Sequence, residues 1–221
     1  MKSLFIRLLP LVLLLPALGC AQGDLTSSKT FQEMNKRPTG AKTGKSDTAT
    51  FAAGCFWCVE AQFKQLKGVK KVVSGYTGGT AVNPSYRQVC TGTTGHAEAC
   101  NIIYNPSVIS YDELLAAFFE AHDPTSLNRQ GADEGTQYRS AIFYHNAEQK
   151  KLAEYYINRL NEEKAYDRPI VTAVSAYGPF YVAENYHQDY YELNGTEPYC
   201  RMVIAPKLEK FKKVFKDKLK G

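Results

Sequence analysis

The stretch Thr48-Ala-Thr-Phe-Ala-Ala-Gly-Cys-Phe-Trp-Cys-Val-Glu60 contains the first two expected elements of secondary structure. A strand is expected up to Gly54. From Cys55 on, apolar residues recur at helical spacing on one side, and these are Phe56, Val59, Phe63 and Leu66. Gly68 is placed to end this helix. The stretch therefore predicts a strand over 48–53 followed by a helix over 55–67.

The rest of the chain continues this alternation. Ser110-Tyr-Asp-Glu113 is a capping box, which predicts the start of a helix, and Pro124 follows the end of that helix. Runs of Val, Ile and aromatic residues favour strands. The further elements expected are helices over 111–121 and 147–164 and strands over 69–75, 99–105, 139–145 and 170–175. This order predicts an α+β fold, a two-layer βαββαβ-like (ferredoxin-like) plait.

The chain is long enough for one good hydrophobic core. It has 221 residues, of which 44% are hydrophobic, and this size favours a single domain. Three long loops are expected, over 76–98, 122–138 and 176–200. Long loops in a compact domain usually carry function, so we expect the site there.

The N-terminus has the features of an export signal. Lys2 and Arg7 accompany an apolar run from Leu8 to Leu18, which is too short to span a bilayer comfortably. The segment ends Ala17-Leu-Gly-Cys-Ala21, which resembles the bacterial lipobox, whose cysteine is acylated. An ordinary signal-peptidase cut near Ala21 is the alternative. We expect a signal peptide over 1–19, a periplasmic or cell-envelope location, and a lipid anchor at Cys20.

A flexible tether is expected over 20–47, before a domain over 48–221. The tether segment is rich in polar residues and has scarcely any apolar periodicity. At the other end, the tail 207–220 is basic, yet its apolar residues recur at helical spacing, at Leu208, Phe211, Val214, Phe215 and Leu219. We expect a surface helix that docks through its apolar face, with membrane contact as the weaker option.

The charge balance argues against a nucleic-acid partner. The net charge is +5 with 27 basic and 22 acidic residues. Removal of Lys2 and Arg7 with the signal leaves 25 − 22 = +3. This excess is too small to indicate binding to nucleic acid.

The two cysteines of the opening stretch form a CxxC pair. Cys55 lies at the expected helix N-terminus, where free N–H groups and the helix dipole favour a thiolate. Cys58 is one turn away and can reach Cys55 to form a disulfide. A structural zinc site is disfavoured because the chain has no second CxxC and no HxxxH. Thioredoxin-like exchange and a purely structural disulfide remain alternatives.

Two of the long loops contain candidate polar residues. Glu98 ends the first loop, and taken alone it is more simply a solvated acid. The glycines of that loop do not match a phosphate-binding loop. Asp133 lies in the second loop among residues typical of a hydrogen-bonding network, and it fits a capped turn equally well. The isolated Cys90 and Cys100 are expected to be packed, inert thiols.

Four separated motifs together resemble the A-type peptide methionine sulfoxide reductases. They are GCFW at 54–57, GHAE at 95–98, Asp133 with GTQYRS at 135–140, and YHQDY at 186–190. The resemblance runs from about residue 48 to residue 200. It implies reduction of the S-epimer of methionine sulfoxide, free or in oxidised proteins that are thereby repaired. It also implies no metal and no bound cofactor.

The resemblance implies a role for each matched residue. Cys55 would be the nucleophile and Glu98 the proton donor to the sulfoxide oxygen. The other implied roles are a wall around the substrate methyl group from Phe56 and Trp57, hydrogen bonds to the oxygen from Tyr86 and Tyr138, and support of the polar side by Asp133. The sulfenic acid left on Cys55 must then be resolved by a second thiol.

Two cysteines are candidates for that second thiol. Cys58 is favoured by proximity. Cys200 lies in Glu197-Pro-Tyr-Cys200, which resembles the family's GYC motif with Pro in place of Gly. Family members often have Gly at position 58, so the order of thiol transfers stays open. The reductant expected for an exported enzyme is an exported thioredoxin-like domain. A disulfide oxidoreductase and a non-catalytic lipoprotein binding module are the alternative functions.

Overall fold

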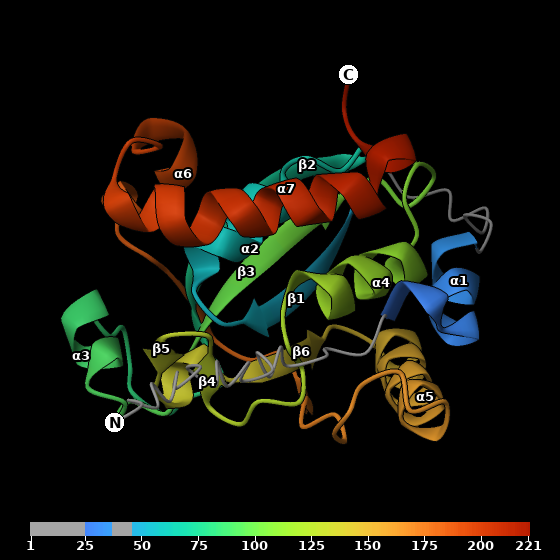
Figure 1. The fold of residues 1–221 in the computed structure, drawn as a ribbon. Coiled ribbons are helices and arrows are strands. Elements are labelled where there is room, and N and C mark those ends of the chain that lie inside the picture. The colour runs from blue at the N-terminus through green and yellow to red at the C-terminus, as the bar shows by residue number, and fades with distance from the viewer. Residues whose placement is uncertain (1–24, 37–45) are drawn as a thin grey trace, which may run out of the picture.

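A six-stranded sheet with helices packed on it organises the chain (Figure 1). The structure is a computed structural model that describes residues 25–36 and 46–221. The strand order is β7-β6-β1-β3-β2-β8, and all neighbours are antiparallel except β6 and β7. The strands are β1 (Asp47–Ala53), β2 (Val69–Thr77), β3 (Ala97–Tyr104), β6 (Ser140–Tyr144), β7 (Ala173–Ala176) and β8 (Phe180–Val182). A separate small hairpin is formed by β4 (Arg129–Gln130) and β5 (Asp133–Glu134).

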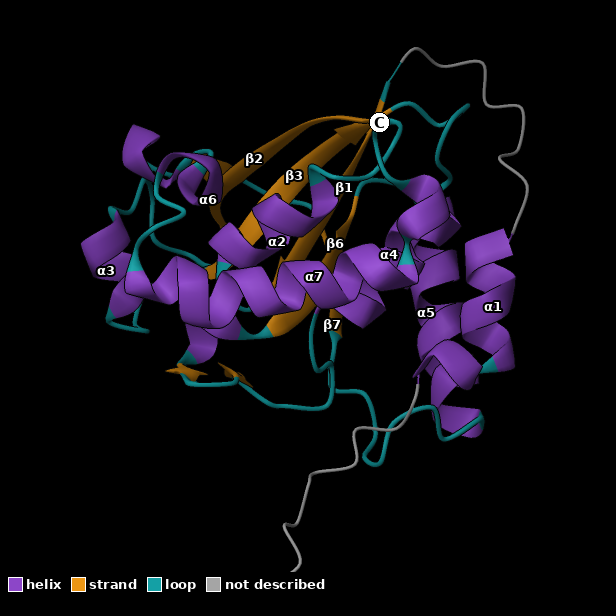
Figure 2. Cartoon of the chain, turned by 45° about the horizontal axis from the view of Figure 1, so that its top comes forward, coloured by secondary structure: helices purple, strands orange, loops and turns teal. Residues whose placement is uncertain are grey.

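Helices α2, α4 and α7 lie over one face of the sheet, as Figure 2 shows, with α1 and α5 together at one side. The α-helices are α1 (Lys29–Lys36), α2 (Phe56–Phe63), α3 (Tyr86–Cys90), α4 (Tyr111–Ala121), α5 (Ala147–Glu162), α6 (Tyr190–Leu193) and α7 (Ala205–Val214). A π-helical turn, Cys200–Ile204, leads directly into α7. The chain therefore forms one α+β domain with a mixed sheet.

The two faces of the sheet have different cores. Phe51 and Ala53 of β1 pack in the main core with the aromatic residues of α2 and α4. Ala52, between them, belongs to a second cluster with residues of β3 and β6. Tyr177 and Phe180 pack against that second cluster. This alternation is the period of two expected along a strand that is covered on both faces.

The register of the sheet brings the ends of β1 and β2 and the starts of β3 and β6 to one edge. Ala53 pairs with Ser140, and Tyr76 pairs with Glu98. Since β1 and β3 are antiparallel, the end of β1 and the start of β3 lie at the same edge. Gly54 and Cys55 follow β1 there, so residues distant in sequence meet beside α2.

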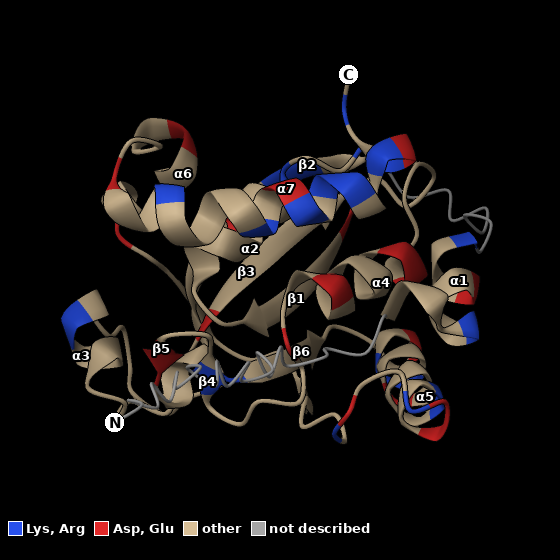
Figure 3. Cartoon of the chain, in the orientation of Figure 1, with Lys and Arg blue, Asp and Glu red and all other residues tan. Residues whose placement is uncertain are grey.

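The C-terminal helix matches the expectation from its apolar spacing. Leu208 and Phe211 of α7 are buried, as is Phe215 just after it. Figure 3 shows lysines along the outside of α7. The basic character of the tail therefore belongs to the exposed face of a helix docked through its apolar side.

The prediction of a flexible tether over 20–47 is wrong for residues 25–36, which are folded onto the domain. Phe31 and Met34 of α1 are buried, and α1 contacts α4 and α5. The Glu163 carboxylate, at the end of α5, accepts hydrogen bonds from the Ser28 hydroxyl and from the Thr30 N–H and hydroxyl. These long-range contacts stabilise a helix too short to be stable alone.

Other expected elements differ from the structure mainly at their ends. Helix 111–121 matches α4, whereas the helix expected over 55–67 ends at Phe63 and the strand expected over 170–175 is β7, shifted toward 176. The expected signal peptide and Cys20 lie outside the described residues. Within the described ranges, no helix combines the length and apolar character needed to cross a membrane.

Candidate active site

Cys55 lies at the turn between β1 and α2. Gly54 has a φ of +85°, a left-handed conformation that glycine adopts without a steric cost. Cys55 is the N-cap residue of α2 and is 7% exposed. Its carbonyl oxygen accepts the Cys58 N–H at 3.1 Å. The expected position of Cys55 at a helix N-terminus is confirmed.

The pKa of the Cys55 thiol is raised, whereas a thiolate was expected at this position. Burial raises the pKa of the Cys55 thiol, and Cys58 raises it further, whereas the interactions of Cys55 with the Tyr199 hydroxyl and the Trp57 N–H lower it. The pKa of Cys58 is lowered, chiefly by its hydrogen bond with Cys55. Burial therefore opposes the effect that the helix terminus was expected to have on the Cys55 thiol. The two thiols titrate as a pair.

Glu98 lies beside the proposed nucleophile. Its Oε2 accepts a hydrogen bond from the Phe56 N–H at 3.1 Å, and its side chain is 1% exposed. Burial raises the pKa of this carboxyl well above its usual value, and repulsion from Cys55 and Asp133 adds to the rise. Glu98 is therefore not a solvated surface acid. A buried carboxyl of this kind can keep its proton and donate it.

Tyr86 and Tyr138 approach Glu98 from two different loops. Tyr86 is the first residue of α3, and Tyr138 ends the 3₁₀ helix Thr136–Tyr138. Burial raises the pKa of both hydroxyls, and the charge of Glu98 contributes in each case. Both side chains therefore retain an O–H that can donate to an oxygen near Glu98.

Asp133 is connected to the thiols through Tyr199. The Tyr199 hydroxyl donates to Asp133 Oδ2 at 2.7 Å. The same hydroxyl interacts with Cys55, which contributes to the raised pKa of Tyr199. Asp133 therefore contacts the site through a hydrogen bond between residues 66 positions apart in the sequence. A turn that is capped only by its own side chains would not need this bond.

Aromatic residues enclose the start of α2. Phe56 is buried, whereas Trp57 is half-buried and stacks on Tyr190 with ring centroids 3.7 Å apart and planes 7° apart. The Trp57 Nε1–H donates to His187 Nδ1 at 3.2 Å, and the His187 ring lies 4.3 Å from the Tyr86 ring. Phe56 and Trp57, which were expected to form a wall around the substrate methyl group, are therefore held in place by other aromatic rings.

Three thiols meet in one cluster. Cys55, Cys58 and Cys200 are all buried in it, and Tyr138 and Tyr199 pack against it. All five cysteines of the described ranges are free. Within those ranges, no group of His, Cys, Asp and Glu is arranged to hold a metal ion.

The other two cysteines differ from one another. Cys100 is buried, and its Sγ donates to the Phe56 carbonyl oxygen at 3.6 Å, as expected of a packed thiol. Cys90 is exposed at the end of α3, so the expectation that it is packed is wrong. Tyr86 is its hydrogen-bonding neighbour.

His187, Tyr190 and Tyr199 are site residues without a predicted role. The first two belong to the motif YHQDY at 186–190. Tyr199 directly precedes Cys200. A His and several Tyr gathered in the third long loop were the available signal, but their partners lie in α2 and β5.

Comparison with known proteins agrees with this geometry. A family model described as "Peptide methionine sulfoxide reductase" matches residues 47–219. Peptide methionine sulfoxide reductase MsrA 1 of Rhodopirellula baltica is 55% identical over 175 residues, which are 79% of this chain and 90% of the relative. The MsrA of Deinococcus radiodurans is 50% identical over 194 residues, 88% of this chain and 94% of the relative.

Solved structures agree as well. The crystal structure of Mxr1 from Saccharomyces cerevisiae in reduced form has a TM-score of 0.66 and 35% sequence identity, and the match covers 71% of this chain and 90% of that chain. The chain therefore belongs to the peptide methionine sulfoxide reductase family and is an oxidoreductase that reduces methionine sulfoxide with thiols.

Proposed function

We propose that Cys55 attacks the sulfur of methionine S-sulfoxide while Glu98 protonates the sulfoxide oxygen. The observation that carries this proposal is the hydrogen bond between Glu98 and the N–H of Phe56, the residue next to Cys55. A sulfoxide is a poor electrophile until its oxygen is protonated or strongly hydrogen-bonded, so the acid must face the thiol. The hydroxyls of Tyr86 and Tyr138 add dipoles directed at the same oxygen.

The first half of the reaction balances without a cofactor. The sulfoxide and the Cys55 thiol give methionine and Cys55 sulfenic acid, so one S–O bond breaks and one forms. Cys55 is oxidised and the substrate sulfur is reduced. The rings of Phe56 and Trp57 bind the methyl group of the substrate. Asp133 supports the polar side of this site by holding the Tyr199 hydroxyl.

The second half restores the thiol. The Cys58 thiol attacks the sulfenic acid, which gives the Cys55–Cys58 disulfide and releases water. Cys58 is favoured as the first resolving residue because its hydrogen bond to Cys55 already joins the two thiols. Cys200, in the same buried cluster, is the second candidate or a later relay. An external thioredoxin-like dithiol then reduces the disulfide.

The substrates proposed are oxidised methionine residues in proteins and free methionine sulfoxide. The central strands β6-β1-β3-β2 support the finer description of the fold as a ferredoxin-like plait. Export and a lipid anchor at Cys20 are proposed from the lipobox-like Ala17-Leu-Gly-Cys-Ala21. Intact mass of membrane-extracted protein tests the anchor. Wild type should carry acyl chains that Cys20→Ala lacks, and equal masses after correction for the substitution would contradict it.

Stereospecific turnover tests the proposed chemistry. Purified protein with dithiothreitol should consume the S-epimer of methionine sulfoxide and hardly the R-epimer, followed by chromatography of the two epimers. Cys55→Ser should consume neither. Equal turnover of both epimers by wild type, or none, would overturn the proposal.

A further inference from the structure

The turn that carries Cys55 is packed against a side chain from the β4–β5 hairpin. A Cβ placed on Gly54 would lie 2.6 Å from Gln130 Cγ and 2.7 Å from Gln130 Cβ. The aliphatic part of Gln130 therefore occupies the space beside the glycine at which the chain leaves β1. Gln130 is 4% exposed, so this contact is part of the packed interior.

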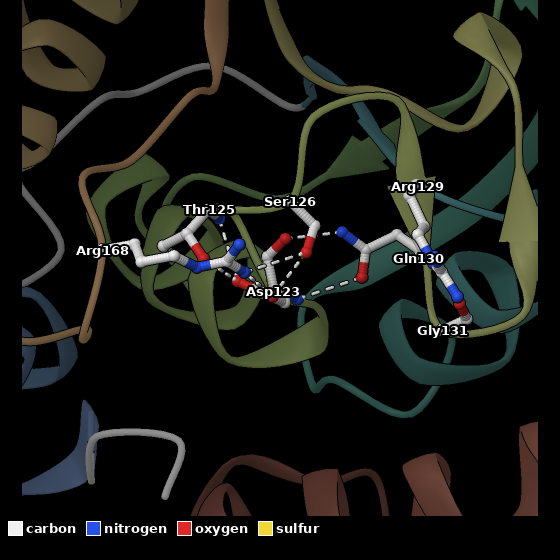
Figure 4. Close-up of polar contacts among 7 residues, drawn as sticks. All are labelled: Asp123, Thr125, Ser126, Arg129, Gln130, Gly131 and Arg168. Carbon is white, nitrogen blue, oxygen red and sulfur yellow. Dashed lines mark hydrogen bonds and ion pairs between the residues drawn. The ribbon is translucent and has the colours of Figure 1, made fainter. Parts of the chain in front are cut away.

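The amide end of Gln130 binds both backbone groups of one residue. Its Nε2 donates to the Asp123 carbonyl oxygen at 2.5 Å, and its Oε1 accepts the Asp123 N–H at 3.1 Å. Figure 4 shows the Gln130 amide directed at Asp123. The side chain thus spans from the turn before Cys55 to the loop that follows α4.

Asp123 is itself held in a fixed position. Its Oδ1 accepts the N–H and hydroxyl of Thr125, and its Oδ2 accepts the hydroxyl of Ser126 and one guanidinium N–H of Arg168 (Figure 4). These bonds and the Arg168 charge lower the pKa of the Asp123 carboxyl, although burial opposes the change. Asp123 can therefore act as a stable point of attachment for Gln130.

Gln130 also belongs to the β4–β5 hairpin, which contacts the site through Asp133. Gln130 pairs with Asp133 across β4 and β5. Asp133 accepts the Tyr199 hydroxyl, which interacts with Cys55. A shift of Gln130 would therefore move the site from two sides, through Gly54 and through Asp133.

We propose that Gln130 is a positioning residue that fixes the Gly54–Cys55 turn and the Asp133 hairpin relative to each other. The amide bonds to Asp123 hold Gln130, and its aliphatic part holds Gly54. This inference rests on the proposed role of Cys55. Gln130 acts through the Gly54 turn and the Asp133 hairpin, so we expect it to affect the rate of the chemical step and not substrate affinity.

Gln130→Met tests the role of the amide. Methionine retains Cβ, Cγ and a similar volume against Gly54 but cannot bind Asp123. Gln149→Met is the matched control, because Gln149 is equally buried and also bonds two backbone groups, the Thr48 carbonyl oxygen and the His145 N–H, at the other end of β1. Both variants should lose comparable thermal stability.

The readout is the single-turnover rate of methionine release at saturating S-sulfoxide, together with KM, at a temperature where all variants are folded. Gln130→Met should lower the rate about tenfold or more with KM within twofold of wild type, while Gln149→Met keeps the wild-type rate. Equal rates in the two variants would overturn the positioning role. An inactive wild type would instead overturn the proposed function.

Gln130→Glu keeps the test informative if the methionine variant does not fold. A protonated carboxyl can donate to the Asp123 carbonyl oxygen and accept its N–H, as the amide does, whereas the ionised form repels that carbonyl oxygen. The rate of Gln130→Glu relative to wild type should therefore rise as the pH is lowered. A ratio independent of pH would contradict the proposal.

Discussion

Glu98 on β3 is joined to Phe56, the first residue of α2, by a hydrogen bond of 3.1 Å from the Phe56 N–H to Glu98 Oε2. The bond ties the carboxyl to the residue that follows Cys55. It also anchors the acid at the helix terminus, where backbone N–H groups have few intrahelical partners. The acid and the nucleophile are therefore held together by the backbone of one turn.

Replacement of Glu98 by glutamine tests the acid directly. Glu98→Gln keeps an oxygen that accepts the Phe56 N–H but cannot protonate a sulfoxide. We expect kcat with dithiothreitol to fall by about 10²–10⁴-fold, the usual contribution of a general acid. Unfolding of the variant by urea should remain cooperative. Activity within threefold of wild type would show that another group supplies the proton.

The stack between Trp57 and Tyr190 predicts an effect on substrate affinity. Tyr190 supports the indole that is proposed to bind the methyl group. An aromatic pair contributes about 0.5–1.5 kcal/mol, so Tyr190→Leu should raise KM by about 2- to 10-fold. Tyr190→Phe is the matched control and should keep the wild-type KM. Equal KM values for the leucine and phenylalanine variants would refute this role of the stack.

The raised pKa of the buried Glu60 is expected to make the free energy of unfolding depend on pH. This residue of α2 is 2% exposed, its Oε1 accepts the Asp189 N–H at 3.1 Å, and burial raises its pKa from 4.5 to about 7. A raised pKa means that the folded state binds more protons than the unfolded state between these values. The associated stability is present below pH 4.5 and is lost as the pH rises through 7.

Glu60→Gln should remove this loss, because the amide keeps an acceptor for Asp189 and cannot ionise. Between pH 5 and pH 9, the free energy of unfolding of wild type should fall by on the order of 3 kcal/mol more than that of the variant. Urea denaturation at a series of pH values measures both. Parallel pH profiles would show that Glu60 ionises in the folded state as it does in the unfolded chain.

Local signals in the sequence predicted most of the core elements. The capping box at Ser110 gave the start of α4, because its hydrogen bonds involve only neighbouring residues. Helix α1 was missed because it depends on Glu163, 133 residues away from Thr30, and on burial of Phe31 and Met34. No local pattern contains such contacts.

The candidate site could be predicted only in part, because some of its contacts join residues that are far apart in the sequence. Four motifs indicated the family, and the structure brings Cys55, Glu98 and Asp133 to one edge of the sheet. The Tyr199 contact with Asp133 could not be predicted, since it joins two loops. The raised pKa of Cys55 could not be predicted either, because it results from burial by residues that meet only in the fold.

A single turnover without external reductant tests the central claim most directly. Reduced protein mixed with excess methionine S-sulfoxide should release about one methionine per chain and form a Cys55–Cys58 disulfide, identified by mass mapping. Cys58→Ser should still release one methionine and leave a sulfenic acid on Cys55 that dimedone traps. Release of methionine by Cys55→Ser would contradict the account.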